Sequence, residues 1–194
     1  MSDIMSNIVS NSLKNPATGE TYTFLRRSGE TGGELLQLRW AARPGARVGE
    51  HVHPLQEDRF TVLEGTLTVS IDGTLRRCSP GEAVAVPAGA RHHFANEGEE
   101  PVVATLELRP ALRMEQVFEA LAGLAREGRA RDDGLPRNLL DLAVFAHEFR
   151  DEIRGARPPY PVQRMVLPPL AAIARRLGRR AHRPEYRLEV AGTS

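Results

Sequence analysis

The sequence predicts a mainly β protein, a sandwich or barrel of short strands, followed by a short α-helical C-terminal extension. Two observations support this fold class. Up to about residue 110 the chain consists of short runs in which apolar and polar residues alternate, broken by Gly, Pro and Asp. After Pro110 the apolar residues recur at helical spacing. We therefore expect a flexible N-terminal segment at 1–19, a β-barrel at 20–110, and a helical extension at 111–194 that packs on the barrel or on a second subunit.

The expected strands follow one another closely, and turn sequences such as ARPGA, SPGE and PAGA separate them. Many short strands with no helical period between them are typical of a sandwich or barrel. Leu36, Leu38 and Trp40 share one strand face, because side chains alternate along a strand. The candidate apolar walls of a pocket are Phe60, Val62 and Phe94. The strand sequences are TYTFLRR (21–27), GELLQLRWAA (33–42), RFTVLEGTLTVSID (59–72), EAVAVP (82–87), HHFAN (92–96) and VVATLELR (102–109).

Three helices are expected in the extension. The third is expected to begin near Pro168 and to end at Gly178, because proline is favoured at a helix start and glycine just past its end. The apolar positions that indicate the first helix are Val117, Phe118, Leu121, Leu124 and Ala125. Those that indicate the second helix are Leu139, Leu142, Ala143, Ala146, Phe149 and Ile153.

Two windows of the chain contain the residues that suggest chemistry. In the first, GARVGEHVHPLQEDRFTVLEG (45–65), His51 and His53 are two residues apart on an expected strand and therefore project from the same face. In the second, GEAVAVPAGARHHFAN (81–96), a Pro-Ala-Gly turn reverses the chain into the strand that carries His92. If these faces line the barrel interior, three imidazoles converge and a carboxylate can join them, which indicates a metal site.

The two windows resemble the two sequence motifs of the cupin superfamily. The first reads G-x(5)-H-x-H-x(4)-D-x(6)-G from Gly45 to Gly65, and the second reads G-x(5)-P-x-G-x(2)-H-x(3)-N from Gly81 to Asn96. The short spacing between them is typical of bacterial single-domain cupins (monocupins, with the cupin type 2 conserved barrel). The resemblance covers about residues 20–110. It implies a small double-stranded β-helix, or jelly roll, in whose mouth three histidines and one carboxylate hold a divalent metal.

The carboxylate departs from the cupin pattern, because cupins usually have Glu at the position that Asp58 occupies here. Asp is one methylene shorter, so its oxygen would lie roughly 1–1.5 Å further from a metal held at about 2.0–2.2 Å by the other ligands. Glu57 is the alternative carboxylate, but its strand parity is opposite to that of Asp58. Three outcomes stay open: the strand shifts inward, a water bridges to a metal held by three histidines, or Glu57 replaces Asp58. By register, the resemblance implies the ligands His51, His53, Asp58 and His92, with weaker metal binding than in a Glu-bearing site.

The other histidines and the cysteine are expected to have structural or surface roles. His93 should point away from the face that carries His92. His147 and His182 lie in the helical part and in a basic tail, where packing or surface roles are expected. Cys78 is the only cysteine, so the chain can form no intramolecular disulfide and a reducing compartment is expected.

The expected metal site has open coordination positions for water, substrate or dioxygen, and its donor set suits Fe, Mn, Ni, Zn or Cu. Our leading hypothesis is a metal-dependent oxygenase-type oxidoreductase, a dioxygenase acting on a small organic substrate in the barrel pocket. One alternative is a Lewis-acid isomerase or lyase in the same pocket. Another is a non-catalytic cupin that binds a small molecule with weak or no metal. The fold alone does not choose among them.

Composition argues against nucleic acid and membrane partners, because the net charge is only +1. The arginine-rich segment 174–183 is expected to be a solvated helix end, where cations are locally favourable. The longest apolar run, within 165–174, is about half of a membrane span, and the first residues lack the pattern of a secretory signal. We therefore expect a cytoplasmic protein with a small-molecule ligand. A homodimer is also expected from the cupin resemblance.

Overall fold

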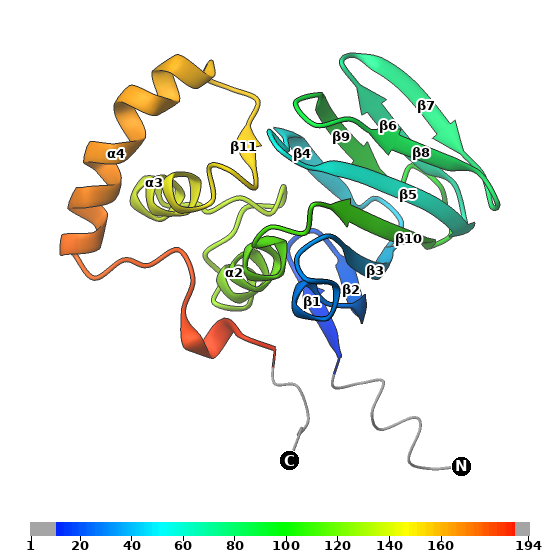
Figure 1. The fold of residues 1–194 in the computed structure, drawn as a ribbon, viewed down its shortest axis with the longest axis horizontal. Coiled ribbons are helices and arrows are strands. Elements are labelled where there is room, and N and C mark those ends of the chain that lie inside the picture. Colours follow the sequence, from blue (N-terminus) through cyan, green and yellow to red (C-terminus); the bar gives the residue numbers. More distant parts are fainter. Residues whose placement is uncertain (1–10, 189–194) are drawn as a thin grey trace, which may run out of the picture.

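Two antiparallel sheets form the β part of the computed structural model, which describes residues 11–188. In Figure 1 these sheets lie on the right and the helices on the left. The larger sheet contains, in order, β1 (Ser12–Asn15), β2 (Glu20–Arg26), β3 (Leu36–Ala42), β10 (Val102–Arg109), β5 (Glu57–Glu64) and β8 (Ala83–Val86). The smaller sheet contains β11 (Arg154–Gly155), β4 (Arg47–Val52), β9 (Arg91–Ala95), β6 (Leu67–Ile71) and β7 (Thr74–Cys78). The prediction of a mainly β jelly roll followed by helices is confirmed.

The core between the sheets is built by the alternating apolar residues of the strands. On β3 the side chains of Leu36, Leu38 and Trp40 are buried, while Arg39 between them is exposed. Trp40 meets Phe60 of the same sheet edge-on with ring centroids 5.5 Å apart. It also meets Phe94 of the facing sheet at 5.5 Å, and Phe60 and Phe94 lie 5.2 Å apart. Such edge-on aromatic contacts stabilise beyond the area they bury, and here they join the two sheets.

The sheet begins before the expected start of the barrel. Strand β1 lies within the segment 1–19 that the sequence suggested to be flexible, and it pairs with β2 from Ser12 to Asn15. Leu13 of β1 is buried in the core. The sequence did not predict this strand, because four residues are too few to show a clear alternation of apolar and polar side chains. Residues 1–10 lie outside the part of the chain that the structure describes.

A glycine separates the two strands within the apolar run 59–72. Gly65 follows β5 with a φ of +74°, a conformation that residues with a Cβ rarely adopt. A Cβ at this position would also lie 2.5 Å from the carbonyl oxygen of Pro101. Close approach of two backbones and a positive φ therefore both require glycine here.

The extension contains α2 (Met114–Arg126), α3 (Leu139–Glu148), α4 (Tyr160–Arg176) and the short 3-10 turn η2 (Pro184–Tyr186). A second 3-10 turn, η1 (Ser28–Thr31), lies between β2 and β3. The first helix agrees with its predicted stripe. The second begins at the predicted Leu139 but ends at Glu148, before Phe149 and Ile153. The predicted start of the third helix near Pro168 is wrong, because α4 begins at Tyr160 and contains Pro168 and Pro169 in its interior. The helix-start proline is Pro161, in the first turn, where its missing N–H costs no helical hydrogen bond.

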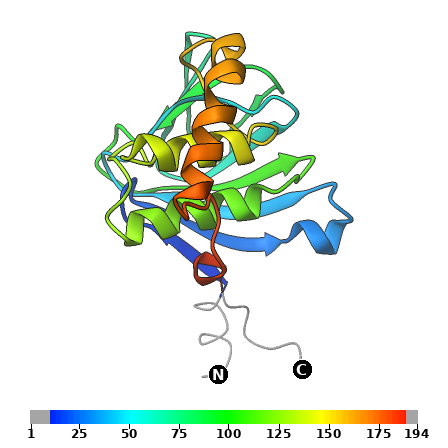
Figure 2. The same ribbon diagram turned by 90° about the vertical axis from the view of Figure 1, so that its left-hand side faces the viewer.

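Helix α2 attaches the extension to the barrel. Its Val117 and Ala120 are fully buried, and Phe118 stacks on Tyr22 of β2 with ring centroids 4.4 Å apart. Arg27, which follows β2, forms an ion pair of 2.7 Å with Glu115 in the first turn of this helix. Helix α3 packs against α4, which forms the outermost layer and crosses α3 in Figure 2.

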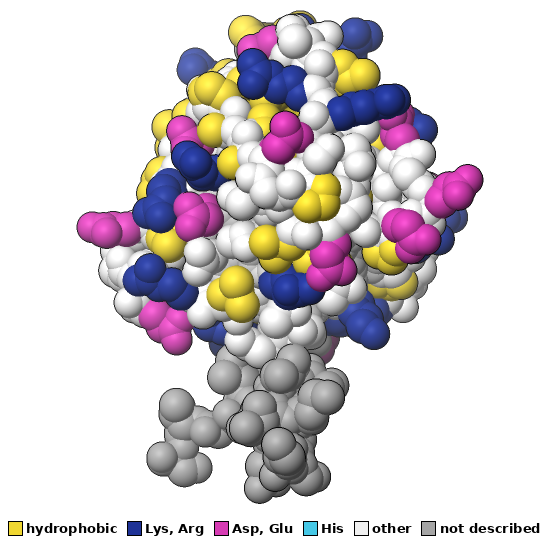
Figure 3. All heavy atoms as spheres, turned by 90° about the vertical axis from the view of Figure 1, so that its right-hand side faces the viewer, with side chains coloured by type: hydrophobic (Ala, Val, Ile, Leu, Met, Phe, Trp, Pro, Cys, Tyr) yellow, Lys and Arg dark blue, Asp and Glu magenta, His cyan; other side chains and the backbone are white. Residues whose placement is uncertain are grey.

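The outer faces of the barrel and of the extension differ in their side chains. The barrel face remote from the helices has positive and negative side chains intermingled with scattered apolar ones (Figure 3). The exposed large apolar residues of the described extension are Leu139, Tyr160, Val162, Met165, Val166, Ile173 and Leu177. All except Leu139 and Leu177 lie on α4, and Leu177 is the residue that caps the C-terminal end of this helix. No helix among residues 11–188 combines the length and apolar character that a membrane crossing requires.

We predict that Phe118→Ala lowers the free energy of unfolding by about 3 kcal/mol, because it removes a buried ring and leaves a cavity against Tyr22. Urea unfolding followed by circular dichroism measures this. Leu75→Ala, at an exposed position of β7, is the control and should change the free energy by less than about 0.5 kcal/mol. Equal effects of the two substitutions would contradict the packing of α2 on the barrel.

A candidate metal centre at the barrel mouth

The three predicted histidines meet between the two sheets. His51 of β4 lies directly opposite His92 of β9 in the strand register, and His53 follows β4 immediately. All three side chains are buried. Each ring has one nitrogen that lies within 4.8 Å of a nitrogen of both other rings. These three histidines could therefore hold a metal ion.

Each imidazole is oriented by a backbone carbonyl oxygen at Nδ1. His51 Nδ1 is 2.7 Å from the oxygen of Gly49, and His92 Nδ1 is 3.1 Å from that of Ala90. His53 Nδ1 is 2.6 Å from the oxygen of Glu152. A carbonyl oxygen can only accept, so in each neutral ring Nδ1 carries the proton and Nε2 keeps its lone pair. This arrangement fixes the tautomer and orientation in which histidines usually bind metals.

The electrostatics of the cluster also favour a neutral imidazole at His51. Burial lowers the pKa of His51 well below its usual value of 6.5, and the nearby rings of His92 and His53 lower it further. Among the described residues, His92 Nε2 and Asp58 Oδ1 are buried without a hydrogen-bond partner. Buried polar atoms normally have a partner, so these two atoms fit a site that is completed by a bound cation.

The structure places Asp58, and not Glu57, beside the histidines. Asp58 is the second residue of β5 and is buried, with Oδ2 3.3 Å from His53 Nε2 and 3.7 Å from His92 Nε2. Glu57 is exposed, because successive side chains of a strand point to opposite faces. The side chains whose ligand atoms all lie within 4.8 Å of one another are the three histidines, and Asp58 is not among them. Its position is consistent with the shorter reach of Asp compared with Glu.

The other histidines have the structural positions that the sequence suggested. His93 lies opposite Ser70 of β6 and is only partly buried. His182 Nε2 lies 2.8 Å from Glu119 Oε2, which ties the chain after α4 to α2. Cys78 is a buried free cysteine at the end of β7, and burial raises the pKa of its thiol.

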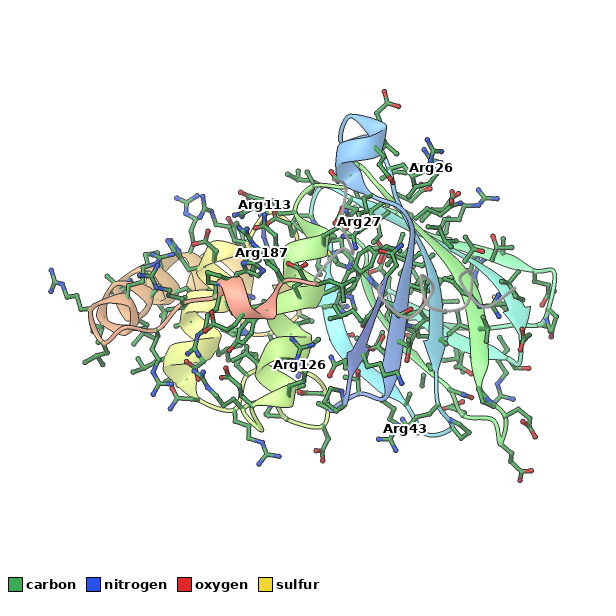
Figure 4. The ribbon with its side chains drawn as sticks, turned by 90° about the horizontal axis from the view of Figure 1, so that it is seen from below. Arg26, Arg27, Arg43, Arg113, Arg126 and Arg187 are labelled. Atoms are coloured by element: carbon green, nitrogen blue, oxygen red, sulfur yellow. The ribbon has the colours of Figure 1, made fainter. Side chains whose placement is uncertain are left out.

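The extension contributes to the site in a way that the sequence did not reveal. The carbonyl that orients His53 belongs to Glu152, 99 residues later in the chain. The Glu152 carboxylate is buried and receives hydrogen bonds from Arg113 at 2.8 and 3.1 Å, while Arg113 also donates to the Glu148 carbonyl. Arg113 and Arg27 both lie along the junction of barrel and extension in Figure 4. No local sequence pattern indicates which backbone carbonyl a distant histidine contacts, so the contact between His53 and Glu152 could be found only in the three-dimensional structure.

The extension also adds a strand next to the histidines. Strand β11 pairs with β4 in the register Arg154 to Val52 and Gly155 to His51. The edge of the histidine-bearing sheet is therefore covered by a segment of the same chain, which fixes the backbone on either side of His51.

A small cavity of about 60 Å³ lies between the histidines, the apolar core and α2. Its walls include Val48 and Phe94 of the smaller sheet, Leu106 of the larger sheet and Val117 of α2. Glu20 of β2 also lines it, although sequence reasoning did not select this residue. The sequence contained one signal that could have identified Glu20: an acidic residue two positions before Tyr22, and therefore on the same inward face of the strand.

The carboxylate of Glu20 is buried and accepts hydrogen bonds from Trp40 Nε1 at 2.8 Å and from Thr18 Oγ1 at 2.6 Å. Burial raises its pKa above 4.5, although these hydrogen bonds oppose the shift. Burial and the Glu20 charge also raise the pKa of Tyr22 well above 10. Glu20 is therefore a group in the cavity wall that binds a proton more readily than an exposed glutamate.

The comparison with protein families agrees with this architecture. Residues 38–107 match the family model described as Cupin domain, and they include all three histidines and Asp58. Residues 38–107 of the chain therefore form a cupin domain.

Curated relatives cover parts of the chain. It is 37% identical over 68 residues to "Polyketide synthase CurC" of Streptomyces cyaneus. This match covers 35% of this chain and 44% of that protein. It is 34% identical over 94 residues to "Tetracenomycin polyketide synthase protein TcmJ" of Streptomyces glaucescens, 47% of this chain and 62% of that protein. The chain thus spans about half the length of these relatives. Among solved structures, KdgF from Halomonas sp. is similar with a TM-score of 0.46 and 20% identity, over 53% of this chain and 89% of that chain.

We predict that Glu20→Gln becomes more stable relative to the wild type as pH rises. The raised pKa means that the folded wild type binds this proton more tightly than the unfolded chain does, so its stability falls as pH rises from about 4.5 through the folded-state pKa. Gln does not titrate, and this loss is absent in the variant. Melting temperatures at pH 5 and pH 8 measure the difference. Glu99→Gln, at an exposed turn position, should show no such trend, and a pH-independent difference for Glu20→Gln would contradict the prediction.

Proposed function

We propose that this protein is a metal-dependent cupin enzyme of the oxygenase type, which acts on a small organic substrate at His51, His53, His92 and Asp58. The observation that carries the proposal is the set of three buried imidazoles whose Nδ1 atoms are held by carbonyl oxygens. Each ring then offers Nε2 to a common centre, and Asp58 adds one negative charge. Three nitrogens and one carboxylate oxygen suit Fe, Mn, Ni, Zn or Cu.

A bound divalent metal would supply Lewis acidity and, if it is redox-active, chemistry with dioxygen. The residues of the chain set the conditions for that chemistry. The carbonyl contacts hold the imidazoles in one orientation, and the apolar walls of the cavity exclude bulk water. Glu20 can hold or release a proton in the cavity wall, because its raised pKa lies closer to neutral pH than that of an exposed carboxyl.

A second candidate is a Lewis-acid isomerase, lyase or cyclase in the same pocket. The two relatives named above carry polyketide synthase names, and polyketide chains bear carbonyl groups that a Lewis acid polarises. A cupin that binds a small molecule without metal is the third candidate. A homodimer, a cytoplasmic location and the absence of nucleic acid partners stay predictions from the sequence.

Metal analysis tests the site directly. We expect the purified wild type to contain about one first-row transition metal per chain by mass spectrometry, and His51→Ala and His92→Ala to lose it. Asp58→Ala should weaken metal binding by at least about 10-fold, because it removes the buried carboxylate that lies beside His53 and His92. Glu57→Ala is the matched control and should keep the wild-type affinity. Wild-type protein that takes up no metal, even when metal is added, would contradict the proposal.

Oxygen uptake separates the two catalytic candidates. With flavonol or 1,3-dicarbonyl substrates, an oxygenase consumes dioxygen in step with substrate loss, whereas a Lewis-acid enzyme converts its substrate equally well without dioxygen. An oxygen electrode and product analysis under air and under nitrogen measure this. We expect uptake that Asp58→Ala lowers by at least about 100-fold. Equal turnover under nitrogen would favour the Lewis-acid candidate.

A further inference from the structure

A second and larger hollow lies outside the barrel, between the smaller sheet and the extension. This chamber, with a volume of about 450 Å³, is bounded by β4 and β11 on one side, by α3 and α4 on the other, and by the loop 131–135. Its lining is mostly apolar. The apolar residues that face it include Leu135, Leu142, Phe145, Val162, Val166 and Leu170.

The chamber and the barrel cavity share one wall. Six residues line both spaces: Val48, His51, Leu121, Asp133, Gly134 and Ile153. His51 is the candidate metal ligand in this wall, so a molecule in the chamber lies against the metal centre. Two further features keep the wall thin. Gly49 has no side chain, and Gly134 packs so closely on Thr18 that a Cβ would lie 2.8 Å from its methyl group.

The two volumes differ in what they can hold. The barrel cavity of about 60 Å³ has room for about two water molecules, at about 30 Å³ each, or for the reactive end of a substrate. The chamber of about 450 Å³ lies within the range of about 300–1,000 Å³ that is typical of pockets for small organic ligands. A substrate larger than a few atoms therefore needs the chamber for its body.

The polar groups of the chamber define the chemical class of its ligand. Asp133 is already paired with Arg131, at 2.6 and 3.1 Å, and the Gln163 amide donates to the carbonyl oxygens of Gly155 and Pro158. These groups have partners within the protein. The lining also includes the charged and exposed residues Glu50 and Arg157, but most of it is apolar. The remaining surface attracts a neutral, largely apolar molecule.

Resting on the proposed function, we infer that the chamber between α3, α4 and the β4–β11 edge binds the apolar body of the substrate, whose carbonyl or hydroxyl end faces His51. The substrate class is thus a neutral, mainly apolar organic molecule with an oxygen function at one end. The helical extension supplies most of this binding site, and the barrel supplies the reactive centre.

Prodan, a neutral naphthyl ketone whose emission reports the polarity of its surroundings, is a suitable probe because it is apolar with a carbonyl at one end. We expect it to bind the full chain with a 1:1 stoichiometry and a blue-shifted emission. Val166→Glu places a charge in the chamber lining and should weaken binding by at least about 10-fold. Val166 is 46% exposed, so the protein tolerates the substitution, and Val162→Glu, at 44%, provides a second test.

Met165→Glu is the matched control, because this neighbouring residue of α4 is 78% exposed and lies outside the chamber lining. It should bind Prodan as the wild type does. Metal content should be the same in Val166→Glu, Met165→Glu and the wild type. Light scattering must show the same oligomeric state for all three, since a change of mass in Val166→Glu alone would identify the apolar face as a contact between two copies and overturn the inference.

The two proposals fail in different ways. Metal-loaded protein that binds no Prodan, or that binds it equally well after Val166→Glu and Val162→Glu, would overturn the inference and leave the metal site intact. Prodan binding that persists in His51→Ala, which is expected to lose its metal, would support the chamber independently of the metal. Wild type that takes up no metal, even when metal is added, and still binds Prodan with the predicted sensitivity to Val166→Glu would contradict the enzyme proposal and support the chamber.

Discussion

The hydrogen bond between His53 Nδ1 and the carbonyl oxygen of Glu152 is the interaction on which the architecture of this protein depends. Three imidazoles can converge only if each ring is held in one orientation. Two of the three carbonyl oxygens that do this lie two residues before their histidine, at Gly49 and Ala90, and the third comes from the extension. The barrel therefore does not complete the candidate metal centre by itself, and folding of the extension and formation of the site are linked.

The Glu152 carbonyl is in turn positioned by an ion pair whose carboxylate is buried and whose guanidinium is partly exposed. Its own side chain accepts two hydrogen bonds from Arg113, whose guanidinium also binds the carbonyl of Glu148 at the end of α3. A buried carboxylate without such a partner would be strongly destabilising, so Arg113 and Glu152 constrain each other. Together with the Phe118–Tyr22 stack, this pair makes α2, α3 and the barrel one continuous packed unit around the histidines.

This arrangement divides the tasks between the two parts of the chain. The barrel provides rigid strands, which place His51 and His92 opposite each other and Asp58 beside them. The extension closes the sheet edge with β11, orients His53 and encloses the apolar chamber that adjoins His51. A site built on strands varies little in geometry, whereas the surrounding helices and loops can be shaped for one ligand.

The sequence by itself determined the features that depend on local periodicity. The alternation along β3, the helical stripe of α2, the two-residue spacing of His51 and His53 and the opposite parity of Glu57 and Asp58 are visible in the chain, because each follows from the geometry of one element. Only the tertiary structure decided the rest. Which proline starts α4, which carbonyl holds His53, why Glu20 is buried in the cavity wall and where the apolar chamber lies all depend on contacts between segments far apart in the chain. The physical reason is that local spacing fixes the direction of a side chain, whereas its partners depend on how whole elements pack.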